Sequence, residues 1–454
     1  MKIAIIGSGI AGLAVAHRLN GRAEVTLFEA GSYFGGHTHT VDVTLPLASG
    51  GEATHGVDTG FLVFNERTYP NLIALLAELN VATSRSDMSF SAQVPGAAAG
   101  GGALEWSGSS LDTVFAQRAN LLNPRFWGML GDLLRFNRLT TALAEAGRDA
   151  ELMQPLGDFL VDNRFGTAFR DWYFLPMMAC IWSCPTAQML RFPVATMVRF
   201  CHNHGLIQVT GRPQWWTVAG GARHYVDKIT ARIADKRLDT PVLRVARTTG
   251  GVHVISREHG ETRQETFDKV VFATHSDQAL DLLEAPTSDE IATLGAIRYH
   301  PNRAVLHTDA SVLPRRPKAW AAWNYESAPA VSTADDASPR VCLHYLINRL
   351  QPVPWQQPVV VSLNPIREIA RNDVMGSFDY AHPVFDLAAI RAQGRMPALQ
   401  GRQHTYFCGA WMGYGFHEDG LKAGLGVADR LLAEIDGQAP GTDPTTAPRA
   451  LAAA

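Results

Sequence analysis

Residues 7–12 read Gly-Ser-Gly-Ile-Ala-Gly, and this stretch decides the fold that the sequence predicts. In the pattern G-x-G-x-x-G, the glycines allow a tight turn, a close approach of the backbone to a pyrophosphate, and close helix–strand packing. An apolar run at residues 3–6 precedes the stretch, as a buried strand would, and residues 13–19 read as a helix. The expected unit presents a helix N-terminus to a dinucleotide phosphate, and its binding positions are Gly7, Ser8, Gly9, Ile10, Ala11 and Gly12.

A second strand is expected over residues 24–29, and Glu29 ends it. This acid stands about 20 residues beyond the first glycine, where the fingerprint places a carboxylate for the ribose hydroxyls of an adenosine. A βαβ-type opening with these features predicts an adenine dinucleotide site.

The segment after Glu29 distinguishes between the dinucleotides. Residues 30–37 read Ala-Gly-Ser-Tyr-Phe-Gly-Gly-His. Here the chain resembles the flavin-containing amine oxidase and phytoene desaturase superfamily, in which a Glu-Ala-x-x-x-x-Gly-Gly stretch continues the FAD site. The resemblance implies FAD as the cofactor and adds Ala30, Gly35, Gly36 and His37 to its site. Family members usually carry an arginine after the glycine pair, and this sequence has His37 instead.

A strand, a loop and a final helix are expected over residues 405–435. In the same superfamily this arrangement holds the isoalloxazine ring, which implies contacts from Gly409, Ala410, Gly420 and Leu421. A helix N-terminus stabilises the negative charge of a reduced flavin. Cys408 precedes this loop at a strand end, where cysteine commonly serves as a small hydrophobe, so FAD is expected to be bound non-covalently.

Two further stretches carry a narrower resemblance. Residues 58–65, Asp-Thr-Gly-Phe-Leu-Val-Phe-Asn, and residues 413–420, Gly-Tyr-Gly-Phe-His-Glu-Asp-Gly, are similar to a bacterial subgroup described as predicted NAD/FAD-binding proteins. Members commonly occur beside fatty-acyl methyltransferase-like genes, and some are implicated in oxidising or desaturating acyl chains. The resemblance implies an FAD-dependent oxidoreductase that transfers hydride from an apolar, fatty-acyl or lipid substrate to the flavin. It also adds Thr59 to the FAD site.

Candidate catalytic residues come from two places. Tyr414, His417 and Glu418 stand where the family's flavin loop would bring them near the ring. His417 or Glu418 could move a proton during C–H oxidation, or could simply cap the following helix. Arg303 stands about where many amine oxidases have a lysine near the flavin, and arginine does not readily give up its proton. That difference argues against amine oxidation.

Several functions remain open. An amine oxidase, a redox-neutral double-bond isomerase and a non-catalytic flavin-bound partner of a lipid enzyme would share this fold. An aromatic set could line a tunnel for an apolar substrate or could be ordinary core. Its members are Trp172, Tyr173, Phe174, Trp182, Trp215 and Trp216.

The fold class is expected to be α/β, with a discontinuous Rossmann-like FAD-binding domain and an α+β substrate domain. The second domain would be helical over residues 110–200 and rich in strands over residues 297–365. The tail at residues 437–454, rich in Pro, Ala, Gly and Thr, is expected to be disordered. The FAD domain would comprise residues 1–85, 205–290 and 395–436, and the substrate domain residues 86–204 and 291–394.

Composition excludes other classes. A net charge of −3 without any basic run argues against nucleic acid as a partner. Five sparse cysteines do not form a disulfide framework, so a reducing cytoplasmic location is expected, with peripheral membrane contact as a possibility. The uncharged run at residues 172–190 contains two prolines and reads as buried rather than membrane-spanning. The close histidine pairs, His37 with His39 and His202 with His204, lack a ligand frame, so no metal site is expected.

Overall fold

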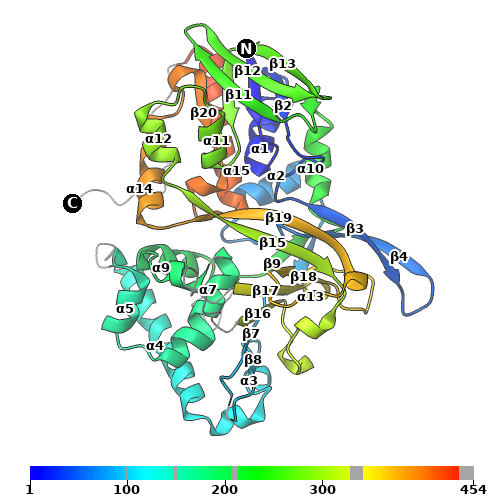
Figure 1. The fold of residues 1–454 in the computed structure, drawn as a ribbon, viewed down its shortest axis with the longest axis vertical. Coiled ribbons are helices and arrows are strands. Elements are labelled where there is room, and N and C mark those ends of the chain that lie inside the picture. The colour runs from blue at the N-terminus through cyan, green and yellow to red at the C-terminus, as the bar shows by residue number, and fades with distance from the viewer. Residues whose placement is uncertain (99, 147–151, 184, 206–212, 328–340, 439–454) are drawn as a thin grey trace.

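The computed structural model describes residues 1–98, 100–146, 152–183, 185–205, 213–327 and 341–438. Its fold is mixed α/β, with two lobes that lie one above the other in Figure 1. We call the upper one the nucleotide lobe and the lower one the substrate lobe. The predicted disordered tail falls almost entirely outside the described residues.

The nucleotide lobe is built on a five-stranded parallel sheet in the order β10-β2-β1-β14-β20. Side chains alternate along each strand, so neighbouring residues lie on opposite faces of the sheet. On one face, Ile3 and Ile5 pack into a core with α1 and α15, while Ala4 and Ile6 join a second core with the hairpin strands β11–β13. The strands are β1 (Lys2–Ile6), β2 (Glu24–Phe28), β10 (Asp235–Arg237), β11 (Val242–Thr248), β12 (Gly251–Glu258), β13 (Glu261–Phe267), β14 (Lys269–Phe272) and β20 (Thr405–Phe407).

The first and last long helices, α1 (Ile10–Leu19) and α15 (His417–Ile435), pack against each other. Small residues make this close approach possible. A Cβ on Gly424 would lie 2.3 Å from the carbonyl oxygen of Ala11. Segments at the two ends of the sequence therefore meet beside the nucleotide turn.

The substrate lobe contains a seven-stranded mixed sheet in the order β19-β15-β18-β17-β16-β7-β8. Its two longest strands, β15 and β19, run across the middle of the molecule between the lobes (Figure 1). The strands are β7 (Phe90–Val94), β8 (Leu104–Ser107), β15 (Arg298–His307), β16 (Trp323–Ser327), β17 (Val341–Leu346), β18 (Val360–Leu363) and β19 (Val374–Val384).

A group of helices lies beside this sheet in the lower part of Figure 1. It contains a 3-10 turn, η1 (Arg118–Leu122), and a π-helical turn (Arg170–Phe174). The helices are α3 (Leu111–Val114), α4 (Pro124–Glu145), α5 (Leu156–Asp162), α6 (Thr167–Phe169), α7 (Leu175–Trp182), α8 (Thr186–Met189) and α9 (Val194–Asn203).

Smaller elements connect the lobes. A hairpin, β3 with β4, extends to one side, and β9 pairs with both β5 and β6. These strands are β3 (Thr40–Pro46), β4 (Glu52–Asp58), β5 (Phe64–Asn65), β6 (Thr83–Ser86) and β9 (Trp215–Val218). The remaining helices are α2 (Pro70–Glu78), α10 (Arg223–Thr230), α11 (Ser276–Leu282), α12 (Ser288–Leu294), α13 (Ile347–Leu350) and α14 (Leu387–Arg395).

The uncharged run at residues 172–190 folds as the π-helical turn, α7 and α8, which are interrupted near the two prolines. Its aromatic side chains are buried in the substrate lobe. Among the described residues, we find no helix with the length and apolar character needed to cross a bilayer.

Candidate functional site

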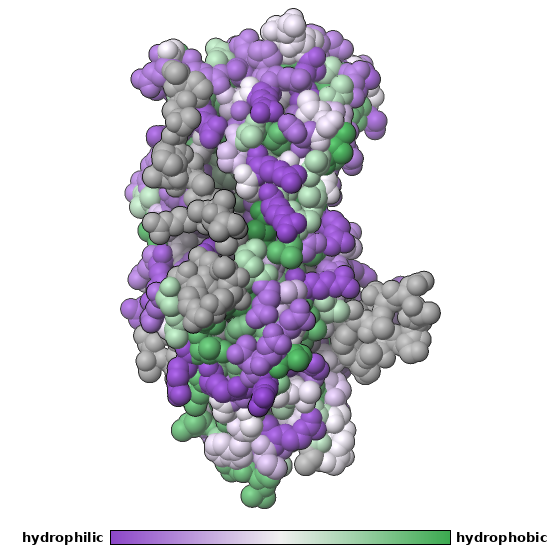
Figure 2. Space-filling model, turned by 90° about the vertical axis from the view of Figure 1, so that its left-hand side faces the viewer, coloured by the Kyte–Doolittle hydropathy of each residue, from purple (hydrophilic) through white to green (hydrophobic). Residues whose placement is uncertain are grey.

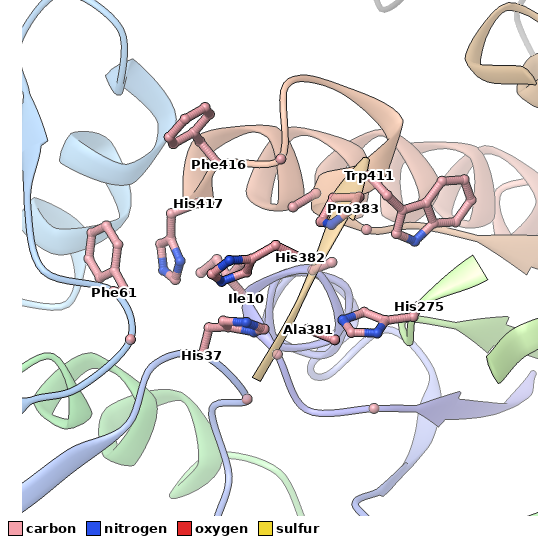
Figure 3. A pocket seen from close by; sticks show the side chains of 18 of the residues that line it. Ile10, His37, Phe61, His275, Ala381, His382, Pro383, Trp411, Phe416 and His417 are labelled. Atoms are coloured by element: carbon pink, nitrogen blue, oxygen red, sulfur yellow. The ribbon is translucent and has the colours of Figure 1, made fainter. Parts of the chain in front are cut away.

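A cavity of about 670 Å³ lies where the two lobes meet. The β1–α1 turn and the start of α15 line it from the nucleotide lobe, and β19 and the helices of the substrate lobe line it from the other side. Figure 3 shows side chains from these distant segments directed into one space. We distinguish two ends of the cavity. The nucleotide end lies near residues 7–11, and the aromatic end lies beyond the loop that precedes α15.

The glycine turn forms the floor of the nucleotide end. Gly7 has a φ of +100°, and a Cβ there would lie 2.8 Å from the carbonyl oxygen of Ala273, so both conformation and space require glycine. A Cβ on Gly12 would lie 2.0 Å from the carbonyl oxygen of Gly7. Gly9 is different, because a Cβ there meets no atom within 4 Å and it lines the cavity. The open space above Gly9 is what close approach of a pyrophosphate requires.

Glu29 is fixed at the side of this cradle. Its carboxylate accepts hydrogen bonds from the Ser8 amide at 3.0 Å, the Ser8 hydroxyl at 2.5 Å and the Gly31 amide at 2.8 Å. Glu29 and Ala30 both line the cavity, as the fingerprint predicts for a ribose-binding acid. Sequence reasoning missed Thr240, Gln278 and other residues on this side, because no motif marks them.

The second glycine pair lies against the first. Gly36, with a φ of +58°, is so close that a Cβ there would lie 3.2 Å from Gly9 Cα. Gly35 forms an isolated bridge with Gly9 and donates its amide to the Ser8 carbonyl at 3.1 Å. The two predicted glycine stretches therefore form one backbone cradle.

His37 follows this pair and belongs to a ring cluster. Its ring centroid is 4.9 Å from that of Tyr380, 5.4 Å from His382 and 6.4 Å from His275. Its Nε2 atom is buried without a hydrogen-bond partner. Burial, assisted by His275, lowers the pKa of His37 to about 4. In Figure 3, His37 and His382 face a central space, with His275 on one side and His417 on the other.

Histidines are the only basic side chains among the described residues that line the cavity. Among the described residues that line it there is no lysine or arginine, and five histidines are present: His37, His204, His275, His382 and His417. Two acids, Glu29 and Asp281, lie at the nucleotide end. An anionic ligand would therefore be met by backbone amides, the α1 N-terminus and titratable imidazoles.

The loop before α15 lies over the cavity, to which Gly409, Ala410, Tyr414 and Phe416 contribute. Asp419 holds this loop by accepting hydrogen bonds from the amides of Tyr414 and Phe416, both at 3.0 Å. Burial raises the pKa of Asp419 to about 6. Sequence reasoning did not predict this role of Asp419, since the sequence shows only that the helix begins with acidic residues.

His417 lines the cavity, and its surroundings favour a neutral ring. It stacks on Phe61 with ring centroids 3.8 Å apart, and its Nε2 lies 2.7 Å from the Tyr225 hydroxyl. Burial and the nearby His37 lower the pKa of His417 to about 3. At neutral pH it can exchange a hydrogen bond with Tyr225 but carries no charge.

Four predicted FAD-site residues do not line the cavity. The hydroxyl of Thr59 bonds to the Tyr380 hydroxyl at 2.8 Å, which supports the ring cluster from behind. Gly12 and Gly420 allow close packing instead, since a Cβ on Gly420 would lie 2.9 Å from an Ile10 methyl. Leu421 is buried in the main core. These positions shape the site without forming its surface.

Arg303 is also not where it was expected. It is exposed on β15, and its Nε donates to the Ser377 hydroxyl at 3.0 Å. It is absent from the cavity lining, while its neighbour Asn302 is buried. The expected place of Arg303 beside the flavin is therefore corrected, because its side chain is exposed and Tyr299 is the described residue of β15 that lines the cavity.

Glu418 is directed away from the cavity and caps another helix. Its carboxylate accepts hydrogen bonds from the amides of Asn71 at 2.9 Å and Leu72 at 3.0 Å, in the first turn of α2. The Asn71 side chain donates to it as well, at 2.7 Å. The expected catalytic role of Glu418 is corrected to this structural one, because the carboxylate satisfies α2 rather than α15.

Replacement of Glu418 should therefore destabilise the fold without affecting cofactor binding. We expect Glu418→Ala to lower the free energy of unfolding by about 1–2 kcal/mol, as the loss of a helix cap does. Thermal unfolding and FAD titration would measure the two effects separately. The matched control is Asp429→Asn, an exposed acid on the same helix. A large loss of FAD affinity in Glu418→Ala at unchanged stability would contradict the capping role.

The aromatic end is lined by rings from several elements. Of the predicted set, Trp182 and Trp215 line the cavity, whereas Trp172, Tyr173 and Phe174 are buried core residues. Trp216 does not line the cavity and donates its indole N–H to Glu66 at 3.0 Å. The other lining side chains at this end include Phe61, Tyr69, Met88, Ile181, Phe200, Trp323, Tyr345, Phe385, Tyr414 and Phe416.

His204 is the polar group that sequence reasoning missed at this end. Its ring stacks on Phe200 at 3.9 Å, and its Nδ1 donates to the Phe200 carbonyl at 3.0 Å. Burial lowers the pKa of His204 to about 4, so the ring is neutral. Because Nδ1 bears the hydrogen, Nε2 keeps a free lone pair and can accept a proton.

Among the described residues, three potential metal ligands lie close together, and the two histidine pairs are not part of this group. Glu326, Cys342 and His344 have potential ligand atoms within 4.8 Å of one another. His344 Nε2 is 3.2 Å from Glu326 and 3.3 Å from Cys342, and its Nδ1 is 2.6 Å from Ser362. These contacts satisfy the imidazole as a buried hydrogen-bond network. Cys180 is a buried free thiol, and Cys184 lies outside the described residues.

Comparison with known proteins agrees with this geometry. A family model described as flavin-containing amine oxidoreductase matches residues 10–322. No curated protein sequence matches the chain.

Solved structures with the same fold have different activities. A fatty acid isomerase from P. acnes that produces CLA superposes with a TM-score of 0.62 at 17% identity, covering 94% of this chain and 98% of that one. Cyclohexylamine oxidase from Brevibacterium oxydans has a TM-score of 0.62 at 15% identity, with 96% and 99% covered. A putative protoporphyrinogen oxidase from Exiguobacterium has a TM-score of 0.62 at 16% identity, with 95% and 99% covered. At these identities the likeness shows the fold alone.

Proposed function

The chain belongs to the flavin-containing amine oxidoreductase family, and from this premise we propose that it binds FAD non-covalently and oxidises or desaturates a fatty-acyl substrate. As a member of this family it is a flavin-dependent oxidoreductase. The substrate class is the new part of the proposal. One observation carries it, namely the wall at the far end of the cavity, whose described residues are mostly aromatic and include no acid.

The nucleotide end fits FAD. The glycine cradle and the α1 N-terminus would hold the pyrophosphate, and Glu29 would accept the ribose hydroxyls. The unpartnered Nε2 of His37 supplies a further group for an anion. Non-covalent binding is supported by Cys408, which is completely buried and does not line the cavity.

The aromatic end fits an apolar chain better than an amine. Glu29 and Asp281, the two acids among the described lining residues, come from the nucleotide end, so the described part of the aromatic end offers no carboxylate to pair with an ammonium group. An unpaired charge in an apolar cavity is costly, whereas apolar surface gains from burial there. The fatty acid isomerase with this fold shows that the fold is compatible with fatty acids.

The chemistry divides between cofactor and protein. Held by the glycine cradle and Glu29, bound FAD would supply a two-electron acceptor for the substrate C–H bond, and dioxygen or a quinone would be the class of final acceptor. Desaturation also releases a proton from the neighbouring carbon. We propose that Nε2 of His204 takes this proton only transiently, since a pKa of about 4 lets it release the proton again, while the Nδ1 hydrogen bond to Phe200 keeps the ring in place. The surrounding rings exclude water from the reacting bond.

The proposal is tested by mixing FAD-loaded protein, without oxygen, with an unsaturated fatty acid and with the amine of the same chain length. We expect the fatty acid to bleach the flavin absorption and to yield a product with two fewer hydrogens by mass spectrometry. The matched amine should leave the flavin oxidised. Bleaching by the amine alone would make the protein an amine oxidase and overturn the proposal.

Two other outcomes separate the remaining alternatives. A product of unchanged mass with a shifted double bond would identify an isomerase. A flavin that no substrate reduces until a lipid-modifying protein is added would identify a non-catalytic partner. A location in a reducing cytoplasm is part of the proposal and is supported by Cys180, Cys201, Cys342 and Cys408, which are free and buried.

A further inference from the structure

Exposed apolar side chains are concentrated at the end of the substrate lobe. Leu122 is 90% exposed and Leu111 is 80% exposed, and Trp127, Leu134 and Leu121 are each close to half exposed. All five belong to α3, η1 and α4. Figure 2 shows hydrophobic residues gathered at the lower end of the molecule, which in Figure 1 is the end that carries α3 and α4. We call these five residues the apolar tip.

Local contacts hold the side chains of the apolar tip in a defined arrangement. The Trp127 indole donates to the Leu121 carbonyl at 3.0 Å, and its ring lies 5.3 Å from that of Phe115. This contact holds an exposed tryptophan beside two exposed leucines of η1. Monomeric soluble proteins rarely gather large apolar side chains on one surface unless it meets a partner.

Helix α4 has separate inner and outer faces. Phe126 and Met129 are completely buried and face the core of the lobe. On the outer face, Trp127 and Leu134 are seven positions apart (134 − 127), two helical turns, and Gly131 between them leaves open space beside it. The core of the lobe therefore does not use the outer face, which continues the surface formed by η1.

The charges around the apolar tip differ from those of the whole chain. Residues 111–138 contain four arginines and two acids, whereas the chain has a net charge of −3. Arg118 pairs with Asp112, and Arg135 pairs with Asp132. The positive excess comes from Arg138 and from Arg125, whose guanidinium also lies 4.8 Å from the Trp172 ring. Apolar side chains with a basic border match the interior and headgroups of an anionic bilayer.

We propose that the apolar tip docks on the surface of an anionic lipid bilayer. The leucines and Trp127 enter the boundary between headgroups and acyl chains, and the arginines bind lipid phosphates. Contact is peripheral, since none of the described helices can cross a membrane. Helices of the same lobe contribute Trp182 and Phe200 to the aromatic end of the cavity. The docked lobe is thus the one that carries the apolar part of the site.

The proposal does not depend on FAD or on the substrate, so it is tested by vesicle binding of the full chain. We expect co-sedimentation with vesicles of phosphatidylglycerol and phosphatidylcholine, weaker binding to phosphatidylcholine alone, and release by salt. Leu122→Glu should weaken binding at least about tenfold, because burial of a leucine side chain is replaced by a like charge. Because Leu122 is exposed, this variant should keep the thermal stability of the original protein.

The matched control is Ile291→Glu. Ile291 is 51% exposed on α12 in the nucleotide lobe, and the same substitution there should leave vesicle binding unchanged. Equal loss in both variants would mean that binding reflects charge alone and would overturn the proposal. So would an absence of vesicle binding. Concentration-dependent self-association that Leu122→Glu abolishes, with no vesicle binding, would assign the surface to a second copy of the chain.

Discussion

Gly9→Val is expected to fold normally and to bind FAD at least about 100-fold more weakly, a loss of about 2.7 kcal/mol or more. Gly9 has a φ of −62° and a ψ of 175°, an extended conformation that valine adopts readily. A Cβ at this position meets no protein atom within 4 Å. The added methyl groups would instead occupy the cavity space that a pyrophosphate needs.

Two other glycines make the interpretation specific. Gly12→Val should fail to fold, because its Cβ would lie 2.0 Å from the Gly7 carbonyl oxygen. Gly426→Ala, at a position on α15 with open space beside it, should bind FAD normally and be slightly more stable. Thermal unfolding of the FAD-free variants and FAD fluorescence titration give the two readouts. Gly9→Val that binds FAD as tightly as the original protein would place the pyrophosphate elsewhere.

These glycines also show why the nucleotide end could be predicted from the sequence. Their spacing depends on local geometry, since a turn, a strand and a helix lie within about 20 residues. The expected strands and helices near residues 2–28 and 405–435 match β1, α1, β2, β20 and α15 to within a few residues. The α/β fold class is confirmed by the parallel sheet. The domain boundaries stay a prediction.

The ring cluster could not be predicted, because it depends on distant pairing. Tyr380 and His382 come from β19, more than 300 positions after His37. No local sequence pattern indicates that β19 crosses the molecule beside the backbone cradle of the two glycine stretches. The strand pairing of β15 with β19 places these rings there.

The errors at Arg303 and Glu418 have a similar origin. Among its described residues, β15 lines the cavity at Tyr299, whereas Arg303, four positions further along, lies on an exposed part of the strand. For Glu418, the sequence identified an acid at a helix start. It could not show that α2 brings unpaired amides to the same place. Tertiary contacts decided both roles.

FAD binding is expected to take up protons and to tighten as the pH falls. Burial lowers the pKa of His37 and His275 to about 4 and of His382 to about 3. A pyrophosphate placed among them favours the imidazolium form and raises these pKa values. This effect applies at pH values between the low histidine pKa values without FAD and the higher ones with FAD bound. In that range, each proton taken up makes FAD binding up to about tenfold tighter for every unit by which the pH falls.

The empty protein should respond to pH in the opposite direction. A histidine whose folded pKa lies below its unfolded value of about 6.5 stabilises the fold above that pH. The contribution is lost as the pH falls from about 6.5 toward 4, because the unfolded chain then binds more protons. Asp58, whose pKa burial raises to about 7, has the opposite influence on stability. Because Asp58 does not line the cavity, its contribution should be the same with and without FAD. The difference in the pH dependence of stability between FAD-bound and FAD-free protein therefore reports on the histidines.

Calorimetric titration of FAD in two buffers of different ionisation enthalpy measures the proton uptake directly, and titrations from about pH 8 to about pH 6 give the slope. His37→Gln should weaken binding at the acidic end and flatten the slope. His37→Arg should hold a positive charge at every pH, so binding at about pH 8 should become tighter than in the original protein. If FAD bound without proton uptake, backbone amides and the α1 N-terminus would suffice for the pyrophosphate. The lack of lysine and arginine among the cavity-lining residues that the structure describes would then have no consequence for affinity.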